Sequence, residues 1–275
     1  MNCLQELKLH YGPSEGYALY RMVMEECFNL SHTDILLGKD SHISEEKQNR
    51  LEEITSRLLK NEPIQYILGY AWFHGQRFNV RNGVLIPRPE TELLVDKVLE
   101  MAQTHTENTS TKILDIGTGS GCIAISLALA GHKVTAMDIS EDALNIAQEN
   151  AIILEADVDF VHENILHPSA SSEQWDIIVS NPPYICLHEA EEMERNVLDH
   201  EPHLALFVPD TDPLIFYRAI ASFAMSHLAP NGWLYLEINQ AFPNEITQLL
   251  SSFGFSDITI IPDQYGKKRI AYAHL

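Results

Sequence analysis

KILDIGTGSGCIAISLALA, residues 112–130, joins a short run typical of a buried strand to a longer apolar segment typical of a helix. Three glycines, Gly117, Gly119 and Gly121, lie between the two. Glycines spaced this closely permit positive φ without strain and let the backbone approach a ligand. The stretch therefore predicts a strand, a ligand-binding loop and a helix, in that order.

The alternation of strands and helices continues on both sides of this unit, from about residue 91 onward. Strand–helix repeats of this kind imply a mostly parallel sheet with helices on both faces, an α/β architecture. The expected strands are 112–116, 133–138, 157–162, 175–179, 233–238, 257–263 and 269–275, and the expected helices are 90–103, 122–130, 141–154, 213–228 and 244–253.

The chain before residue 91 divides into two parts. Residues 1–70 are predicted to form a small helical bundle, because Leu51, Ile54, Leu58 and Leu59 recur at helical spacing on one face. Residues 71–90 are rich in aromatic and β-branched side chains, and they predict a β-hairpin connector around Arg81-Asn82-Gly83. Residues 91–275 then form the α/β domain.

The composition excludes several classes of protein. The 275 residues carry a formal net charge of -21, which is opposite to the basic surface of a duplex-binding protein. The four cysteines are far apart and show no C-x-x-C spacing, so neither a disulfide framework nor a metal site is expected. There is no signal-like N-terminus and no run of 18 apolar residues. We expect a cytoplasmic protein that does not associate with membranes.

The glycine loop differs from two familiar phosphate-binding loops. The dinucleotide fingerprint needs a sixth-position glycine where Cys122 stands, and the Walker A loop needs a Lys-Ser/Thr pair that is missing. Asp138 ends the next strand about 20 residues later, where a carboxylate can bind the two hydroxyls of a ribose. Capping the following helix is the alternative role, for which Ser140 competes. S-adenosylmethionine fits this pattern better than NAD.

The stretch Ser180-Asn181-Pro182-Pro183-Tyr184 follows the strand 175–179. Two prolines cannot donate ladder hydrogen bonds, so the strand must end there. Carboxyl ends of parallel strands are where open α/β sheets bind their ligands. We therefore expect these residues to form part of the site rather than a plain turn.

The residue types suit methylation of a planar nitrogen, whose lone pair is delocalised. The side-chain oxygen of Asn181 and the carbonyl of Pro182 can accept the two N–H protons and aim the nitrogen at a methyl donor. The ring of Tyr184 can stack on the flat group. Positive charge develops on the nitrogen during transfer, so each preorganised bond is worth on the order of 3 kcal/mol in the transition state.

Five segments occur in the order seen in one known family: Gln65–Gly69, LIPRPETE (85–92), DIGTGSGCIA (115–124), SNPPYI (180–185), and Glu201-Pro202 followed by Ala205-Leu206. The chain resembles the peptide chain release factor N5-glutamine methyltransferases, the HemK-type family, from residue 60 to its end. NPPY alone also occurs in DNA adenine-N6 methyltransferases, whereas LIPRPETE is far more specific.

The resemblance implies a Rossmann-like class I S-adenosylmethionine-dependent methyltransferase fold with a seven-stranded sheet. It also implies methylation of the glutamine amide in the Gly-Gly-Gln loop of release factors, with the N-terminal bundle docking that substrate. By motif position, Asn181, Pro182, Pro183 and Tyr184 hold the glutamine, and Asn181, Pro182 and Tyr184 are the catalytic set. The residues that contact the cofactor are then Gly117, Thr118, Gly119, Ser120, Gly121, Asp138, Ile165 and Asn181.

Two segments depart from the family pattern. Asn164 stands where the family usually has an aspartate, and we expect it still to offer an acceptor near the adenine. The family tends to have a glycine-rich segment where this chain reads FVPDTDPLIFY (207–217). That change can alter the loop over the substrate without touching the chemistry.

The main alternative is an adenine-N6 methyltransferase of DNA or RNA that uses the same Asn181–Tyr184 site. It should carry a basic groove, and the acidic composition disfavours one. A nucleotide-dependent oxidoreductase is disfavoured by Cys122, and an inactive binding module by the intact tetrapeptide. We expect a monomer whose partner is the release factor, without direct binding to nucleic acid.

Overall fold

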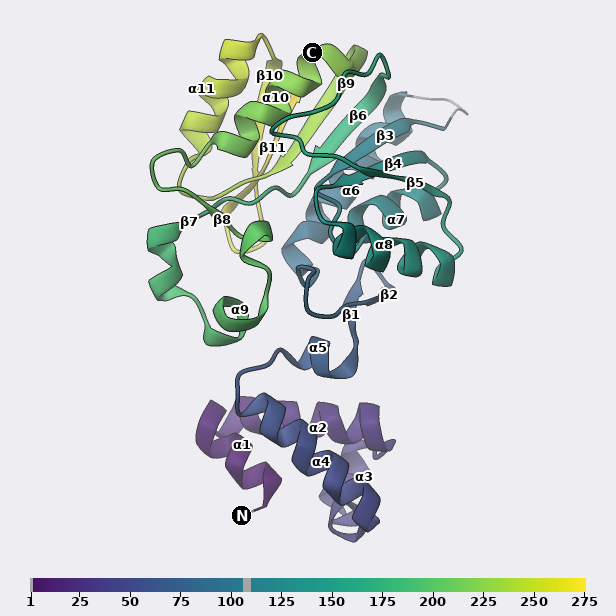
Figure 1. Cartoon of the computed structure of the whole chain (residues 1–275), viewed down its shortest axis with the longest axis vertical. Coiled ribbons are helices and arrows are strands. Elements are labelled where there is room, and N and C mark those ends of the chain that lie inside the picture. The colour runs from purple at the N-terminus through teal and green to yellow at the C-terminus, as the bar shows by residue number, and fades with distance from the viewer. Residues whose placement is uncertain (1, 106–109) are drawn as a thin grey trace. The chain divides into compact units, whose positions relative to one another are not determined.

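A computed structural model describes residues 2–105 and 110–275 of the chain (Figure 1). The chain forms two compact units. The N-terminal unit contains Met1–Tyr70 together with Glu194–His200, and the second unit contains Ala71–Met193 and Glu201–Leu275. Each unit has its own hydrophobic core, so each is described by itself.

The N-terminal unit is helical. Its helices begin where the sequence supplies caps: Asn2 accepts from the amide of Leu4, and Ser31 forms a capping box with Asp34. Gly16 lets two helices pack closely, because a Cβ there would lie 2.5 Å from the backbone of Leu7. The helices are α1 (Cys3–Tyr11), α2 (Pro13–Phe28), α3 (His32–Leu36), η1 (Lys39–His42), α4 (Glu45–Leu58), α5 (Ile64–Leu68) and α9 (Arg195–His200).

A β-hairpin follows, but its turn is not at the position that the sequence predicted. Strands β1 (Tyr70–Phe73) and β2 (Gln76–Asn79) are joined at His74-Gly75, not at Arg81-Asn82-Gly83. Both turn residues have positive φ, 48° at His74 and 74° at Gly75, as the favoured two-residue hairpin turn requires. The turn was predicted at Asn82-Gly83 because Asn-Gly is a common hairpin turn. In the structure His74 takes the left-handed conformation instead.

The second unit is built on a seven-stranded, mostly parallel sheet, as predicted. The strand order is β10-β11-β9-β6-β3-β4-β5, and β11 alone of these strands runs antiparallel to the others. Its strands are β3 (Lys112–Ile116), β4 (Lys133–Asp138), β5 (Val158–His162), β6 (Trp175–Ser180), β9 (Leu228–Glu237), β10 (Ser256–Pro262) and β11 (Lys268–His274). Strands β7 (Ile185–Cys186) and β8 (Phe207–Val208) form a separate parallel pair.

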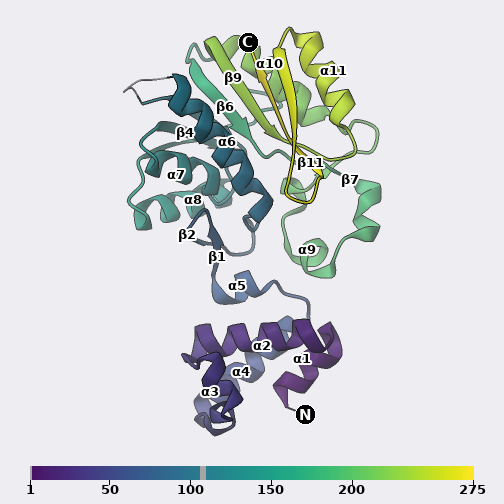
Figure 2. The ribbon, with the colours of Figure 1, turned by 180° about the vertical axis from the view of Figure 1, so that it is seen from behind.

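Helices cover both faces of this sheet, and opposite views show the two layers (Figures 1 and 2). One apolar cluster packs α6 and α7 against the sheet, and the other packs α10 and α11 against the opposite face. The helices are α6 (Pro89–His105), α7 (Cys122–Leu129), α8 (Glu141–Ile153), η2 (Leu187–Glu192), η3 (His203–Ala205), α10 (Ile215–His227) and α11 (Pro243–Phe253).

Two further features bear on the expectations from composition. All four cysteines are free thiols. Within residues 2–105 and 110–275, no helix combines the length and the apolar character that crossing a bilayer would require.

The register of the three central strands positions the site. Ile116 of β3 pairs with Met137 of β4 on one side and with Ser180 of β6 on the other. Gly117, the residue after β3, therefore lies beside Asp138 and Asn181 at the carboxyl edge of the sheet. Strand order diverges at this point, which is where open α/β sheets bind ligands.

Candidate active site

The glycine loop after β3 is held by hydrogen bonds to the neighbouring strand β4 and to β3 itself. The amides of Gly117 and Thr118 donate to the carbonyl of Met137 at 2.8 and 3.0 Å. The hydroxyl of Thr118 donates to Asp115 at 2.7 Å, and this carboxyl is fully buried. Burial raises the pKa of Asp115 to about 7. The loop is thus a rigid wall whose backbone can approach a ligand.

Gly121 has a different role from the other glycines of the loop. It is the N-cap of α7 at φ 82°, and a Cβ there would lie 2.9 Å from Ile125 and 3.1 Å from Ala147. It does not line the cavity, so its position is explained by close packing of α7 against α8. Contact with a cofactor remains a prediction for this residue.

Asp138, at the end of β4, is free for a ligand in the way that the sequence analysis required. Ser140, not Asp138, caps α8, because its hydroxyl accepts from the amide of Ala143 at 3.2 Å. The two carboxylate oxygens of Asp138 accept from the amides of Gly119 and Ser140, both at 2.9 Å. Each oxygen keeps a lone pair, so the carboxylate is fixed in place and can still accept from two hydroxyls.

Asn181 is the first residue after β6, and a chain of hydrogen bonds orients its amide. Its Nδ2 donates to Oγ1 of Thr91 at 3.3 Å, and Oγ1 of Thr91 donates to Oε2 of Glu237 at 2.7 Å. An ionised carboxylate only accepts, so the hydroxyl must donate to it and accept from the amide. Oδ1 of Asn181 is therefore the atom left to accept from a substrate.

Glu237 ends β9 and is fully buried. The hydroxyl of Tyr184 donates to its second oxygen, Oε1, at 3.0 Å. Burial raises the pKa of Glu237, while the bonds from Thr91 and Tyr184 and the nearby charge of Arg269 oppose that shift. One carboxylate thus holds both Thr91 and Tyr184, and neither Thr91 nor Glu237 was found by the sequence analysis.

Tyr184 lies behind this network rather than on the cavity wall. Its ring packs against the core between the sheet and α10–α11. With Glu189, Asn239 and Arg269 it lines a second, smaller hollow. Stacking of this ring on a substrate, which the tetrapeptide predicted, stays a prediction.

The LIPRPETE segment is part of the site. From the sequence it had indicated only the family. The amide of Ile86 and the guanidinium of Arg88 donate to the two oxygens of Glu201, at 3.0 and 2.6 Å. The Glu201 side chain is 1% exposed. The two segments occur together because Ile86 and Arg88 of LIPRPETE bind the carboxylate of Glu201.

These elements enclose a cavity of about 190 Å³. Its wall is mostly apolar, with a few converging polar groups, as is usual for small-molecule sites. The predicted residues that the structure brings together on this wall are Gly117, Thr118, Gly119, Ser120, Asp138, Ile165, Asn181, Pro182 and Pro183. Lining residues that were not predicted include Val84, Leu85, Pro87, Arg88, Thr91, Ile139, Glu163, Leu204, Ala205, Phe216 and Ile220.

Asn164 and Ile165 lie together on one side of the cavity. Oδ1 of Asn164 accepts from the amide of Leu166 at 2.9 Å, so this oxygen shapes the local turn. It can still accept one further bond, as the sequence analysis expected.

The chain matches two family models, the PrmC N-terminal domain over residues 2–69 and the methyltransferase small domain over residues 90–200. A protein of Bacteroides thetaiotaomicron named release factor glutamine methyltransferase is 48% identical over 274 residues, which is 98% of this chain and 96% of the relative. The protein of that name from Flavobacterium psychrophilum is 42% identical, over 97% and 94% of the two chains.

The chain belongs to the release factor glutamine methyltransferase family. The resemblance inferred from LIPRPETE and the other segments is thereby confirmed. Among solved structures, a methyltransferase from Pyrococcus furiosus is 19% identical, with a TM-score of 0.53 over 80% of this chain and 95% of that one. That likeness confirms the methyltransferase fold.

Proposed function

We propose that this protein transfers the methyl group of S-adenosylmethionine to the side-chain amide nitrogen of the Gly-Gly-Gln glutamine in peptide chain release factors. The observation that carries the proposal is the oriented amide of Asn181 at the end of β6. It faces a cavity that continues to Asp138 and the glycine loop. Family membership supports the same activity and substrate.

The residues of the cavity fit the cofactor. Asp138 offers two fixed acceptors for ribose hydroxyls, and apolar side chains such as Ile139 and Ile165 offer a surface for a flat base. Ser120 also lines the cavity, and the backbone of this glycine-rich loop can approach a ligand closely. When bound, S-adenosylmethionine supplies the electrophilic methyl group.

The protein's own part in the reaction is to hold and polarise the glutamine amide. Oδ1 of Asn181 and the carbonyl of Pro182 accept its two N–H protons. Pro182 and Pro183 have fixed φ, so the carbonyl stays in place. Because the nitrogen gains positive charge as the methyl group arrives, both hydrogen bonds strengthen in the transition state. No histidine lines the cavity in the described part of the chain, which suits a reaction driven by positioning.

We propose that the N-terminal unit docks the release factor. Leu9, Leu36 and Leu37 of this unit are about 70% exposed, and exposed apolar side chains suit contact with another protein. The net charge of -21 would favour a basic partner surface over nucleic acid. A substrate that works in translation fits a cytoplasmic enzyme, and we propose that the enzyme acts as a monomer.

Mass spectrometry tests the proposed function. Purified release factor is incubated with the protein and S-adenosylmethionine, and its peptides are then mapped. We expect one added methyl group on the Gly-Gly-Gln glutamine, and none when the enzyme carries Asn181→Ala. Methylated adenine in added DNA or RNA, with an unmodified release factor, would replace this function by the adenine-N6 alternative.

A further inference from the structure

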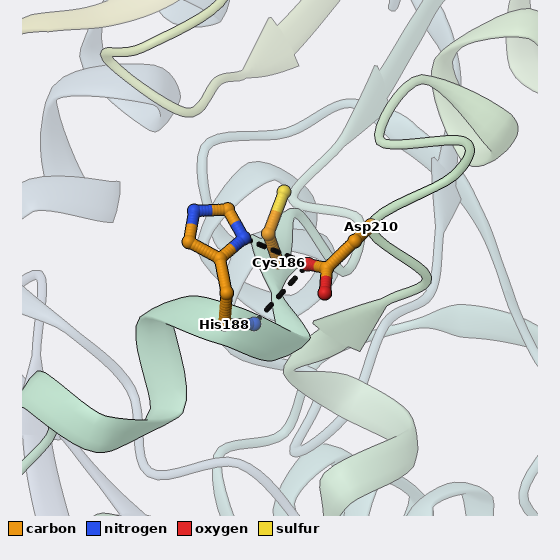
Figure 3. A group of neighbouring side chains, drawn as sticks. All are labelled: Cys186, His188 and Asp210. Atoms are coloured by element: carbon orange, nitrogen blue, oxygen red, sulfur yellow. Dashed lines mark hydrogen bonds and ion pairs between the residues drawn. The ribbon is translucent and has the colours of Figure 1, made fainter.

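Three side chains with metal-binding atoms meet beside the pair of strands β7 and β8 (Figure 3). Cys186 ends β7, His188 is the second residue of η2, and Asp210 follows β8. The thiol, one ring nitrogen and one carboxylate oxygen all lie within 4.8 Å of one another. None of the three residues lines the proposed methyl-transfer cavity.

Backbone structure holds the three side chains in place. Strands β7 and β8 pair in parallel, with Cys186 opposite Val208. The amide of His188 donates to Oδ1 of Asp210 at 3.1 Å, and Nδ1 of His188 lies 2.8 Å from the same oxygen. Cys186 is 1% exposed, whereas the other two side chains are open to solvent. A buried sulfur with two exposed partners forms a shallow, accessible site.

We propose that Cys186, His188 and Asp210 bind a zinc ion. Thiolate, imidazole and carboxylate are the three protein ligands that Zn²⁺ prefers, at roughly 2.3, 2.0 and 2.1 Å. A tetrahedral site with these bond lengths needs donors roughly 3.3–3.7 Å apart. The three donor atoms lie within 4.8 Å of one another, which is close to that spacing. Water takes the fourth position, because His188 and Asp210 face solvent.

The surroundings favour a cation. The carboxylates of Glu189 and Glu192 lie near enough to interact with His188, and Glu189 also accepts from the amide of Cys186 at 2.7 Å. On binding, the S–H bond of Cys186 breaks as the Zn–S bond forms, and the proton goes to the buffer. Nδ1 of His188 gives its lone pair to the metal while Nε2 keeps the ring hydrogen, so no oxidant or reductant is needed.

The metal would join the two ends of a long loop, residues 187–209. Residues 187–209 leave β7 just after the Asn181–Tyr184 tetrapeptide and return through Leu204 and Ala205, which line the cavity. A link between Cys186 and Asp210 restricts this loop and so stabilises the folded state. The cysteine spacing gave no hint of the site, because it uses one cysteine and draws its third ligand from the FVPDTDPLIFY segment.

Zinc titration of the metal-free full-length protein tests the proposal. We expect native mass spectrometry to find one Zn²⁺ per chain and thermal melting to show a higher Tm with zinc. His188→Ala should weaken binding by more than the roughly 10–100-fold that loss of an outer-shell partner costs. Because His188 is exposed, this variant should fold normally. Cys186→Ser, in a buried position, serves as the second variant.

Matched controls separate this site from adventitious binding. Cys27→Ser removes a thiol that is more exposed than that of Cys186, and His32→Ala removes an exposed histidine of the N-terminal unit. Both should bind zinc as the unchanged protein does. With Co²⁺ in place of zinc, a thiolate-to-metal absorption band should appear in the controls and vanish in Cys186→Ser. Absence of stoichiometric zinc, or equal affinity in His188→Ala, would overturn the proposal and leave only a hydrogen bond between His188 and Asp210.

Discussion

Replacing Thr91 by valine should free the amide of Asn181 with little change in the shape of the cavity. Valine keeps the branched volume of threonine but lacks Oγ1. That atom accepts from Asn181 at 3.3 Å and donates to Glu237 at 2.7 Å. Without it, nothing in the network distinguishes the oxygen of the Asn181 amide from its nitrogen. The amide can then turn its nitrogen, a donor, toward the substrate N–H group.

The loss in kcat of the Thr91→Val variant lies between two bounds. If the two amide orientations become equally populated, the competent fraction halves and kcat falls about twofold. If the acceptor is lost altogether, the cost is on the order of 3 kcal/mol, or about 100-fold. We expect a loss in kcat of about tenfold, equal to about 1.4 kcal/mol. The buried Glu237 also loses a donor, which should lower the free energy of unfolding by about 1–3 kcal/mol.

A double-mutant cycle measures this coupling. Turnover of release factor is followed at saturating cofactor and substrate for Thr91→Val, Asn181→Ala and the two together. We expect Asn181→Ala to lose at least about 100-fold, and adding Thr91→Val to change that loss by less than about 0.5 kcal/mol. Urea unfolding of each variant separates catalysis from stability.

The matched control is Thr91→Ser, which keeps the hydroxyl and should restore most of the activity. Losses that simply add in the double variant would mean that Thr91 does not act through Asn181. A Thr91→Ser variant as slow as Thr91→Val would show that the methyl group, not the hydroxyl, is what matters. Either result would refute the orienting network.

Three further predictions follow from the contacts of other carboxyl groups. Asp138→Ala should weaken S-adenosylmethionine affinity by at least about tenfold in calorimetry, because both fixed acceptors disappear, and unchanged affinity would remove its ribose role. Asp115 has a pKa of about 7 when folded and about 3.9 when unfolded, so the folded state binds more protons between these values. Stability should therefore decline as pH rises from about 4 to 7, and Asp115→Asn should flatten that decline in urea unfolding, whereas an identical slope in both proteins would contradict the assignment. Glu201→Gln should lower the free energy of unfolding by about 1.5–3 kcal/mol, since Arg88 loses its charged partner, while the conservative Lys97→Gln, on an exposed pair, should change it by less than about 1 kcal/mol.

Much of the fold could be predicted because it rests on local signals. The alternation of strand and helix patterns after residue 91 predicted the mostly parallel sheet. The hairpin was placed wrongly because its turn uses His74 in the left-handed region, and the energy of that conformation depends on the strands it joins. Turn chemistry alone favoured Asn82-Gly83, which forms only a turn within the connector.

The candidate site was predictable only where motifs end strands. Gly117 and Asn181 each follow a strand, Asp138 ends one, and adjacent parallel strands bring their carboxyl ends to one edge. Thr91 and Glu201 do not follow a strand, and Glu237 ends β9 without a recognisable motif around it. Each lies far along the chain from the residue it serves. Thr91 and Glu237 are 146 residues apart and share one hydrogen bond of 2.7 Å.

The sequence by itself determined the chemistry of this protein: a glycine loop, an acid about 20 residues later and an amide beside two prolines. These depend on residue type and on short-range spacing, which the chain carries directly. The tertiary structure alone decided which atom of the Asn181 amide is left to accept a hydrogen bond and which side chains support it. It also decided that Cys186, His188 and Asp210 meet. Such pairings arise from strand register and burial, so residues separated by many positions become partners only when the sheet has formed.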